Sequence, residues 1–226
     1  MQRIFVITGT DTGVGKTLLT SLLAAHLVRR GVKVAALKPI SSGHRGDARL
    51  LRRALNNSLA LETINPWHFR APIAPLLAAR AEKRAVRLRD VTSHIHAVAE
   101  TIPRPEIILV EGAGGLLSPL GEDFSTRELI VALKAEVVIV GANKLGVVNQ
   151  LRLTIEALPA QSRRKTRIVL MRPARPDRAS PSSIVLLKEL LCGVSAAVLP
   201  HFVNPVEWDR MLASAKVRGV LNHLLE

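Results

Sequence analysis

Hydrophobic residues fall into short continuous runs along this chain, separated by longer segments in which apolar and polar residues recur at helical spacing. Six runs have the length and β-branched content of strands: residues 4–8, 32–37, 107–110, 137–140, 167–171 and 196–199. Strands that alternate with helices predict βαβ units and a mostly parallel sheet. Because these runs are apolar throughout, we expect helices on both faces of the sheet, in a doubly wound α/β fold.

The segment after the first run has the clearest helical pattern. Leucine and alanine recur from Leu18 to Leu27, basic residues occupy the last turn, and Gly31 follows as a C-terminal stop. This arrangement predicts a helix over residues 16–30.

Three further helices have recognisable starts. Ser125 and Glu128 have the spacing of a capping box, which predicts a helix beginning near Ser125. Another helix is expected after Asp90. A third is expected over residues 181–191, because proline suits the first helical turn.

Length and composition favour one globular domain. The 226 residues are 48% hydrophobic and 22% charged, so the chain is apolar enough to build a core and too apolar for a disordered segment. No apolar run is long enough to span a bilayer, and no repeat or linker interrupts the pattern. We therefore expect a single P-loop α/β domain over residues 1–226.

The N-terminal residues and the cysteine content favour a cytoplasmic protein. The first apolar run ends in glycine after too few residues for the core of a signal peptide. Cys192 is the single cysteine, so no internal disulfide can form.

The formal net charge of +14 raises the question of a polyanionic partner. The basic residues are scattered along the sequence, and aromatic residues, which stack on single-stranded bases, make up only 3% of the chain. We therefore expect neither a nucleic-acid nor a membrane partner.

The junction between the first strand and the first helix has the composition of a phosphate-binding loop. Residues 9–17 read Gly-Thr-Asp-Thr-Gly-Val-Gly-Lys-Thr. Glycines allow backbone N–H groups to point at phosphate oxygens, Lys16 can reach the β- and γ-phosphates, and the Thr17 hydroxyl can bind Mg²⁺. The loop is one residue longer than the common pattern. The alternative is a simple strand-to-helix turn, and we expect Gly13, Val14, Gly15, Lys16 and Thr17 to bind ATP.

Further polar residues follow other predicted strands. Lys38 and Ser42 come after the second strand, Asp47 precedes a helix, and Glu111 follows the third strand, shortly before Gly114. Taken singly, these are compatible with a surface lysine, a helix cap or a tight turn. Because open α/β sheets bind ligands at the carboxyl ends of their strands, we expect them to meet at the phosphate-binding loop.

These motifs resemble those of the dethiobiotin synthetase family. The resemblance rests on the long loop at 9–17, Lys-Pro-Ile-Ser-Ser-Gly at 38–43, Asp47-Ala48, Val-Glu-Gly-Ala-Gly-Gly at 110–115, and Lys-Leu-Gly at 144–146 followed by Asn149. Asn65-Pro66 and Ala71-Pro72 match another family segment. The matching segments occur in order through most of the chain.

The resemblance implies an ATP-dependent ligase of biotin biosynthesis that converts 7,8-diaminononanoate and CO₂ into dethiobiotin, ADP and phosphate through a carbamate and its mixed anhydride with phosphate. It also implies a homodimer in which the Lys-Leu-Gly loop contributes to the partner's substrate site. The implied catalytic residues are Thr12, Lys16, Lys38 and Ser42. The implied metal environment, for Mg²⁺, is Thr17, Asp47 and Glu111. Glu111, Gly114 and Pro200 are expected to join the loop in binding ATP, and Ser42, Gly146, Val147 and Asn149 to bind the substrate.

Three departures from the family pattern are visible. Met171 stands where the family commonly has an asparagine that contacts the adenine edge, which predicts relaxed base selectivity because a thioether is only a weak acceptor. Leu76 replaces a histidine, and the stretch between Gly43 and Asp47 is short.

Three alternative functions remain at this stage. A partition-type or septum-site ATPase is compatible with the charge, but such proteins usually have a lysine where this chain has Asp11, five residues before Lys16. A related phosphate-activating ligase would use another substrate, and the amidoligases among them need a glutaminase partner. A small-molecule kinase would need a lid, which the loop over 172–178 could supply.

Overall fold

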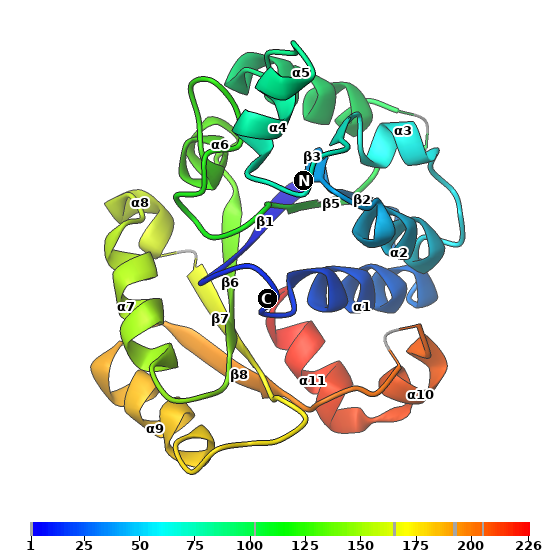
Figure 1. Cartoon of the computed structure of the whole chain (residues 1–226). Helices are drawn as coiled ribbons and strands as arrows, with labels where there is room; N and C mark the ends of the chain where they lie inside the picture. The colour runs from blue at the N-terminus through cyan, green and yellow to red at the C-terminus, as the bar shows by residue number, and fades with distance from the viewer. Residues whose placement is uncertain (1, 102, 165, 192–193, 205) are drawn as a thin grey trace.

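The computed structural model describes residues 2–101, 103–164, 166–191, 194–204 and 206–226, so Cys192 lies outside the described residues. Its centre is a parallel six-stranded sheet with the order β2-β5-β1-β6-β7-β8 (Figure 1). The strands are β1 (Arg3–Gly9), β2 (Val34–Leu37), β5 (Ile107–Glu111), β6 (Glu136–Ala142), β7 (Thr166–Met171) and β8 (Ser195–Leu199). Every neighbouring pair in this sheet is parallel. All six strands predicted from the apolar runs are confirmed, with ends shifted by one or two residues.

Helices cover both faces of the sheet, which confirms the doubly wound arrangement. Adjacent residues of β1 point to opposite faces, so Val6 belongs to one hydrophobic cluster and Ile7 to the other. The cluster around Ile7 includes α1 (Lys16–Arg29), α2 (Gly46–Ala54), α10 (Trp208–Ala213) and α11 (Ala215–His223). The cluster around Val6 includes α5 (Leu88–Ala99), α6 (Thr126–Ala132), α7 (Val147–Glu156) and α9 (Ser180–Leu190).

The helix ends agree with the sequence patterns except at α5. Gly31 follows α1 with φ 72°, a backbone conformation that glycine adopts without strain. Ser125 caps α6 and accepts from the Arg127 N–H at 3.1 Å, and Pro181 lies in the first turn of α9. Helix α5 begins at Leu88, earlier than predicted, because the Asp90 carboxylate accepts from the Arg87 N–H inside the first turn instead of preceding the helix.

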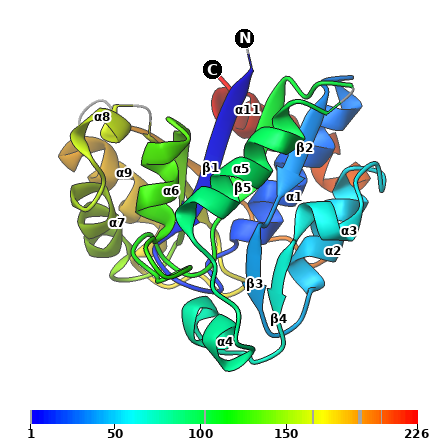
Figure 2. The ribbon, with the colours of Figure 1, turned by 90° about the horizontal axis from the view of Figure 1, so that it is seen from above.

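A second, two-stranded parallel sheet was not predicted. It pairs β3 (Ile40–Ser42) with β4 (Trp67–Phe69), and α4 (Pro75–Ala81) packs beside it (Figure 2). Each strand has only three residues, too few for a hydrophobic period to show in the sequence. The remaining helices are α3 (Leu61–Ile64) and α8 (Ala160–Arg163). In the part of the chain that the structure describes, no helix is long and apolar enough to cross a membrane.

Candidate functional site

A cavity of about 730 Å³ opens beyond the carboxyl ends of the central strands. Its walls come from the loop after β1, the β3–α2 segment, the 72–75 segment and the glycine-rich loop after β5. Ten of the residues predicted for the site line it: Thr12, Gly13, Gly15, Lys16, Thr17, Lys38, Ser42, Asp47, Glu111 and Gly114. The structure therefore brings together predicted residues from three separate stretches of the sequence, 12–17, 38–47 and 111–114.

The loop after β1 has the backbone conformation of a phosphate-binding loop. Gly13 and Gly15 have φ 74° and 101°, values that strain residues with a side chain. Gly15 is the N-cap of α1, and no side chain caps this helix end. The first N–H groups of α1 and the positive end of its dipole are therefore available to an anion.

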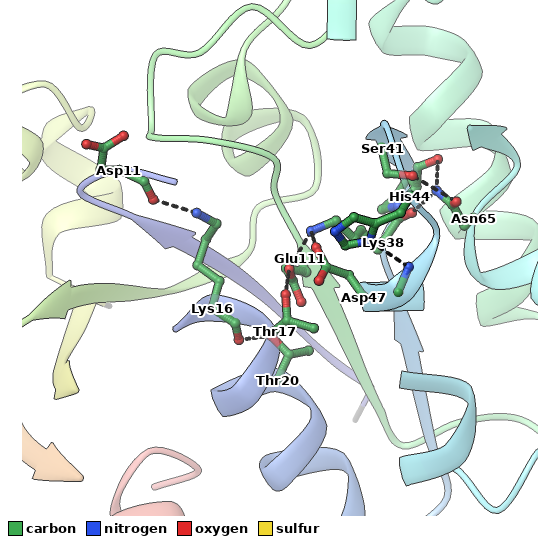
Figure 3. A network of polar contacts seen from close by, with 12 residues as sticks. Asp11, Lys16, Thr17, Thr20, Lys38, Ser41, His44, Asp47, Asn65 and Glu111 are labelled. Carbon is green, nitrogen blue, oxygen red and sulfur yellow. Dashed lines mark hydrogen bonds and ion pairs between the residues drawn. The ribbon is translucent and has the colours of Figure 1, made fainter. Parts of the chain in front are cut away.

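Lys16 extends along this loop with its ammonium group held by the backbone. Its Nζ donates to the Asp11 carbonyl oxygen at 2.7 Å (Figure 3). Burial disfavours the charged form and lowers the pKa of Lys16 to about 8, with Glu111 opposing this shift and Lys38 adding to it. A phosphate bound beside this ammonium would favour its charged form.

Lys38 is the centre of a buried ion cluster. Its Nζ lies 2.6 Å from Glu111 Oε1 and 2.7 Å from Asp47 Oδ2. Burial alone would lower the pKa of Lys38, but the two carboxylates outweigh it and the pKa is raised. For Asp47 burial opposes ionisation, and the nearby Lys38 ammonium overcomes it, so the pKa of that carboxyl is lowered. The cluster is therefore one ammonium between two carboxylates, with an excess of negative charge.

Glu111 connects this cluster to the phosphate-binding loop. The Thr17 hydroxyl donates to Glu111 Oε1 at 2.7 Å, the same oxygen that accepts from Lys38 (Figure 3). The other oxygen, Oε2, is buried and has no hydrogen-bond partner among the described residues. A buried carboxylate oxygen without a donor is costly, and a cation or a bound ligand would satisfy it.

These residues fit a magnesium ion held jointly by protein and substrate. Within the described residues, no cluster of three or more His, Cys, Asp or Glu side chains could form a metal site without other ligands. Mg²⁺ commonly takes one or two carboxylates and completes its shell with water and substrate phosphates. Thr17, Asp47 and Glu111 supply that kind of donor set beside the loop.

Asn65 holds the segment that positions Lys38. It is fully buried, and its Nδ2 donates to the Lys38 carbonyl at 2.7 Å while its Oδ1 accepts from the Ser41 hydroxyl at 2.9 Å. The Arg45 guanidinium also donates to the backbone carbonyl oxygen of Asn65 at 2.8 Å. The only signal for this residue in the sequence was its place in the matching Asn65-Pro66 segment.

Five predicted site residues lie outside the cavity. Val14 is buried and packs in the core beneath the loop, and Pro200 directly follows β8. Gly146, Val147 and Asn149 lie at the N-terminus of α7, where Gly146 has φ 89°, Val147 is fully buried and Asn149 is exposed. Their proposed contact with a partner's substrate stays a prediction.

His44 and Ser118 are polar residues of the cavity lining that were not predicted from the sequence. His44 lies on the turn between β3 and α2, and Ser118 accepts from the Gly115 N–H at 2.9 Å. Neither stands in a recognisable motif, so only the fold shows that they face the site.

Comparison with known proteins agrees with this geometry. A family model described as an AAA domain matches residues 3–203. The ATP-dependent dethiobiotin synthetase BioD of Anaeromyxobacter sp. (strain Fw109-5) is 42% identical over 219 residues, 95% of this chain and 96% of the relative. The enzyme of the same name from Bacillus subtilis (strain 168) is 36% identical over 213 residues, 90% of this chain and 89% of the relative.

Similarity to solved structures supports the fold. The MinD cell division protein of Aquifex aeolicus aligns with a TM-score of 0.62 and 16% identity, over 99% of this chain and 97% of MinD. At that identity the likeness concerns the P-loop architecture alone. The sequence relatives are far more similar and nearly equal in length, and this chain therefore belongs to the dethiobiotin synthetase family of P-loop ATP-dependent ligases.

Proposed function

We propose that this chain forms dethiobiotin from 7,8-diaminononanoate, CO₂ and ATP, a step of biotin biosynthesis. The observation on which this rests is the cluster in which Lys38 meets Glu111 and Asp47 at 2.6 and 2.7 Å, with Glu111 also accepting from Thr17 of the phosphate-binding loop. A phosphate-binding loop alone supports ATP binding. A second buried lysine beside it supports transfer of the γ-phosphoryl group to an anionic acceptor.

The nucleotide would lie with its phosphates on the loop. The N–H groups of residues 13–17 and the Lys16 ammonium would bind the β- and γ-phosphates. The Thr17 hydroxyl, Asp47 and Glu111 would hold Mg²⁺ together with phosphate oxygens, and Mg²⁺ would neutralise charge that develops on the transferring group. Gly114 faces the same cavity, whereas Pro200 lies at the end of β8 and would contact the base.

The acceptor would be a carbamate. One substrate amine adds to CO₂ and loses a proton, giving a carboxylate whose oxygen attacks the γ-phosphorus and displaces ADP. The second amine then attacks the carbonyl carbon of the mixed anhydride, and phosphate leaves as the ring closes. Phosphoryl transfer depends mainly on positioning and on stabilising charge, which are the contributions that Lys16 and Lys38 can make.

Hydroxyl groups complete the proposed arrangement. Thr12 lies on the loop side of the cavity and Ser42 on the side of β3, so both can donate to phosphate or carbamate oxygens. Lys38 directly follows β2 and lines the same cavity, where it could reach both the acceptor oxygen and the migrating group. Its contribution should therefore appear mainly in the transition state.

The proposal extends to assembly and location. We propose a cytoplasmic homodimer in which Gly146, Val147 and Asn149 of one protomer approach the substrate carboxylate bound by the other. The exposed N-terminus of α7 suits this role, because helix N-terminal N–H groups attract carboxylates.

The dependence of ADP release on substrate tests this function. With the wild-type chain, ADP release should need both the diamine and CO₂, because without CO₂ no carbamate exists to attack phosphorus. Lys38→Ala should lower kcat strongly while ATP affinity changes only a few-fold, the pattern of an interaction made chiefly in the transition state. ADP release at full rate without diamine and CO₂ would instead favour a partition-type ATPase.

A further inference from the structure

The ring of His44 is held in one orientation inside the cavity. It lies on the turn between β3 and α2, and its Nδ1 accepts from the Gly46 N–H at 3.1 Å. Residue 46 has no side chain, and a Cβ there would lie only 2.8 Å from Nδ1. A larger residue would therefore displace the ring. Gly46 both binds the imidazole and leaves room for it.

This hydrogen bond fixes which ring nitrogen faces a ligand. Because Nδ1 accepts, we assign the proton of the neutral imidazole to Nε2. Nε2 has no hydrogen-bond partner among the described residues, and His44 is exposed in the cavity wall. Figure 3 places the ring beside Lys38 and Asp47. An N–H donor is therefore available next to the ion cluster.

The other positive groups near this wall already have partners. Lys38 contacts two carboxylates, at 2.6 and 2.7 Å. Arg45, the neighbour of His44, donates to the Asn65 carbonyl at 2.8 Å and pairs with Glu62. The 72–75 segment adds only proline, isoleucine and alanine to the cavity lining. An anion bound on this side would thus find an unpaired N–H donor in His44, in addition to the Ser42 hydroxyl.

We propose that the Nε2–H of His44 binds a carboxylate oxygen of the substrate carbamate. This inference rests on the function proposed above. His44 lies on the β3–α2 side of the cavity with Ser42, a residue of the proposed substrate site, whereas the loop that would bind the β- and γ-phosphates follows β1. This position favours contact with the acceptor over contact with those phosphates. A hydrogen bond to an ionised group contributes an amount equivalent to about 10- to 100-fold in affinity.

Two substitutions separate ligand binding from a structural role. In His44→Asn, the side-chain oxygen can still accept from the Gly46 N–H, but no donor reaches the position of Nε2. In His44→Gln, the longer amide can place its N–H₂ near that position, while the contact with Gly46 is lost. Ligand binding predicts that only His44→Asn is impaired, whereas support of the turn predicts that only His44→Gln is impaired.

Binding should be measured by calorimetry on the full chain with Mg²⁺ and a non-hydrolysable ATP analogue. The diamine is titrated in bicarbonate buffer and in CO₂-free buffer, so that the bicarbonate-dependent gain in affinity reports the carbamate. We expect the bicarbonate-dependent gain in diamine affinity to be about 10- to 100-fold smaller in His44→Asn than in the wild type. His44→Gln should retain most of the gain. The ATP analogue should bind both variants as it binds the wild type. His96→Asn, an exposed histidine on α5, is the matched control.

The outcomes distinguish this inference from the proposed function. If the wild type forms a cyclic urea and His44→Asn shows the full bicarbonate-dependent gain, the role of His44 is wrong and the function stands. Impairment of His44→Gln alone, or equal impairment of both variants, also overturns the role. If the wild type forms no cyclic urea and bicarbonate does not affect diamine binding, the proposed function itself fails.

Discussion

Replacing Lys38 by methionine removes the ammonium group from the ion cluster while keeping most of the aliphatic stem. Two carboxylates lose their partner, but their surroundings differ. The side chain of Asp47 is 40% exposed and water can solvate it, whereas the side chain of Glu111 is 0% exposed. The main cost should therefore come from an uncompensated charge on Glu111.

The size of this cost follows from the contacts that remain. Removing one partner of a buried ion pair costs about 3–5 kcal/mol. The Thr17 hydroxyl still donates to Glu111 Oε1 at 2.7 Å in the variant, so we expect a value near the lower end, about 3 kcal/mol. For a protein of this size, that corresponds to a fall in Tm of about 6–12 °C.

Urea and thermal unfolding of the ligand-free protein at neutral pH, monitored by circular dichroism, would measure this effect. The control is the double variant Lys38→Met with Glu111→Gln, in which neither position of the buried pair is charged and most of the stability should return. A single variant as stable as the wild type, or a double variant no more stable than the single one, would refute the reasoning.

Three further predictions concern the nucleotide site. Lys16→Ala should lower turnover by about two to three orders of magnitude, because it removes one preorganised donor to the phosphates, and unchanged turnover in a folded variant would exclude that role. Because burial lowers the pKa of Lys16 to about 8, its ammonium is present at pH 7 and lost as pH rises through 8, so calorimetry should show ATP affinity falling above pH 8, with proton uptake on binding. A constant affinity from pH 7 to 9.5 would contradict this. Finally, since Met171 offers no N–H donor, turnover with ATP, CTP and GTP at equal Mg²⁺ should differ by far less than the roughly 10⁴-fold that a hydrogen-bonding pocket can impose. Strong ATP preference would mean that backbone groups near Pro200 recognise the base.

Much of the fold could be predicted because its signals are local. A buried parallel strand is a continuous apolar run, and the stop at Gly31 and the capping box at Ser125 each need only a few neighbouring residues. The pair β3 and β4 could not be predicted, since each strand has only three residues and the two meet only when the chain folds. That the chain folds as one domain stays a prediction.

The candidate site was predictable where the chemistry follows a strand. Lys38 and Glu111 come at the ends of β2 and β5, strands that pair in parallel, so their side chains meet at one edge. His44 and Asn65 were not assigned a role, because their contacts with the Gly46 N–H and the Lys38 carbonyl form only in the folded chain. Their roles depend on tertiary geometry and not on residue type or spacing.

A single-turnover reaction with ¹⁸O-labelled bicarbonate tests the central claim most directly. The enzyme in excess is mixed with ATP, Mg²⁺, diamine and freshly dissolved label, and the reaction is stopped before the label exchanges with water. Because the carbamate oxygen that attacks the γ-phosphorus leaves with it when the ring closes, one ¹⁸O atom should appear in the phosphate for each dethiobiotin formed. Phosphate without ¹⁸O, or ADP released without a cyclic urea, would contradict phosphorylation of a carbamate by this chain.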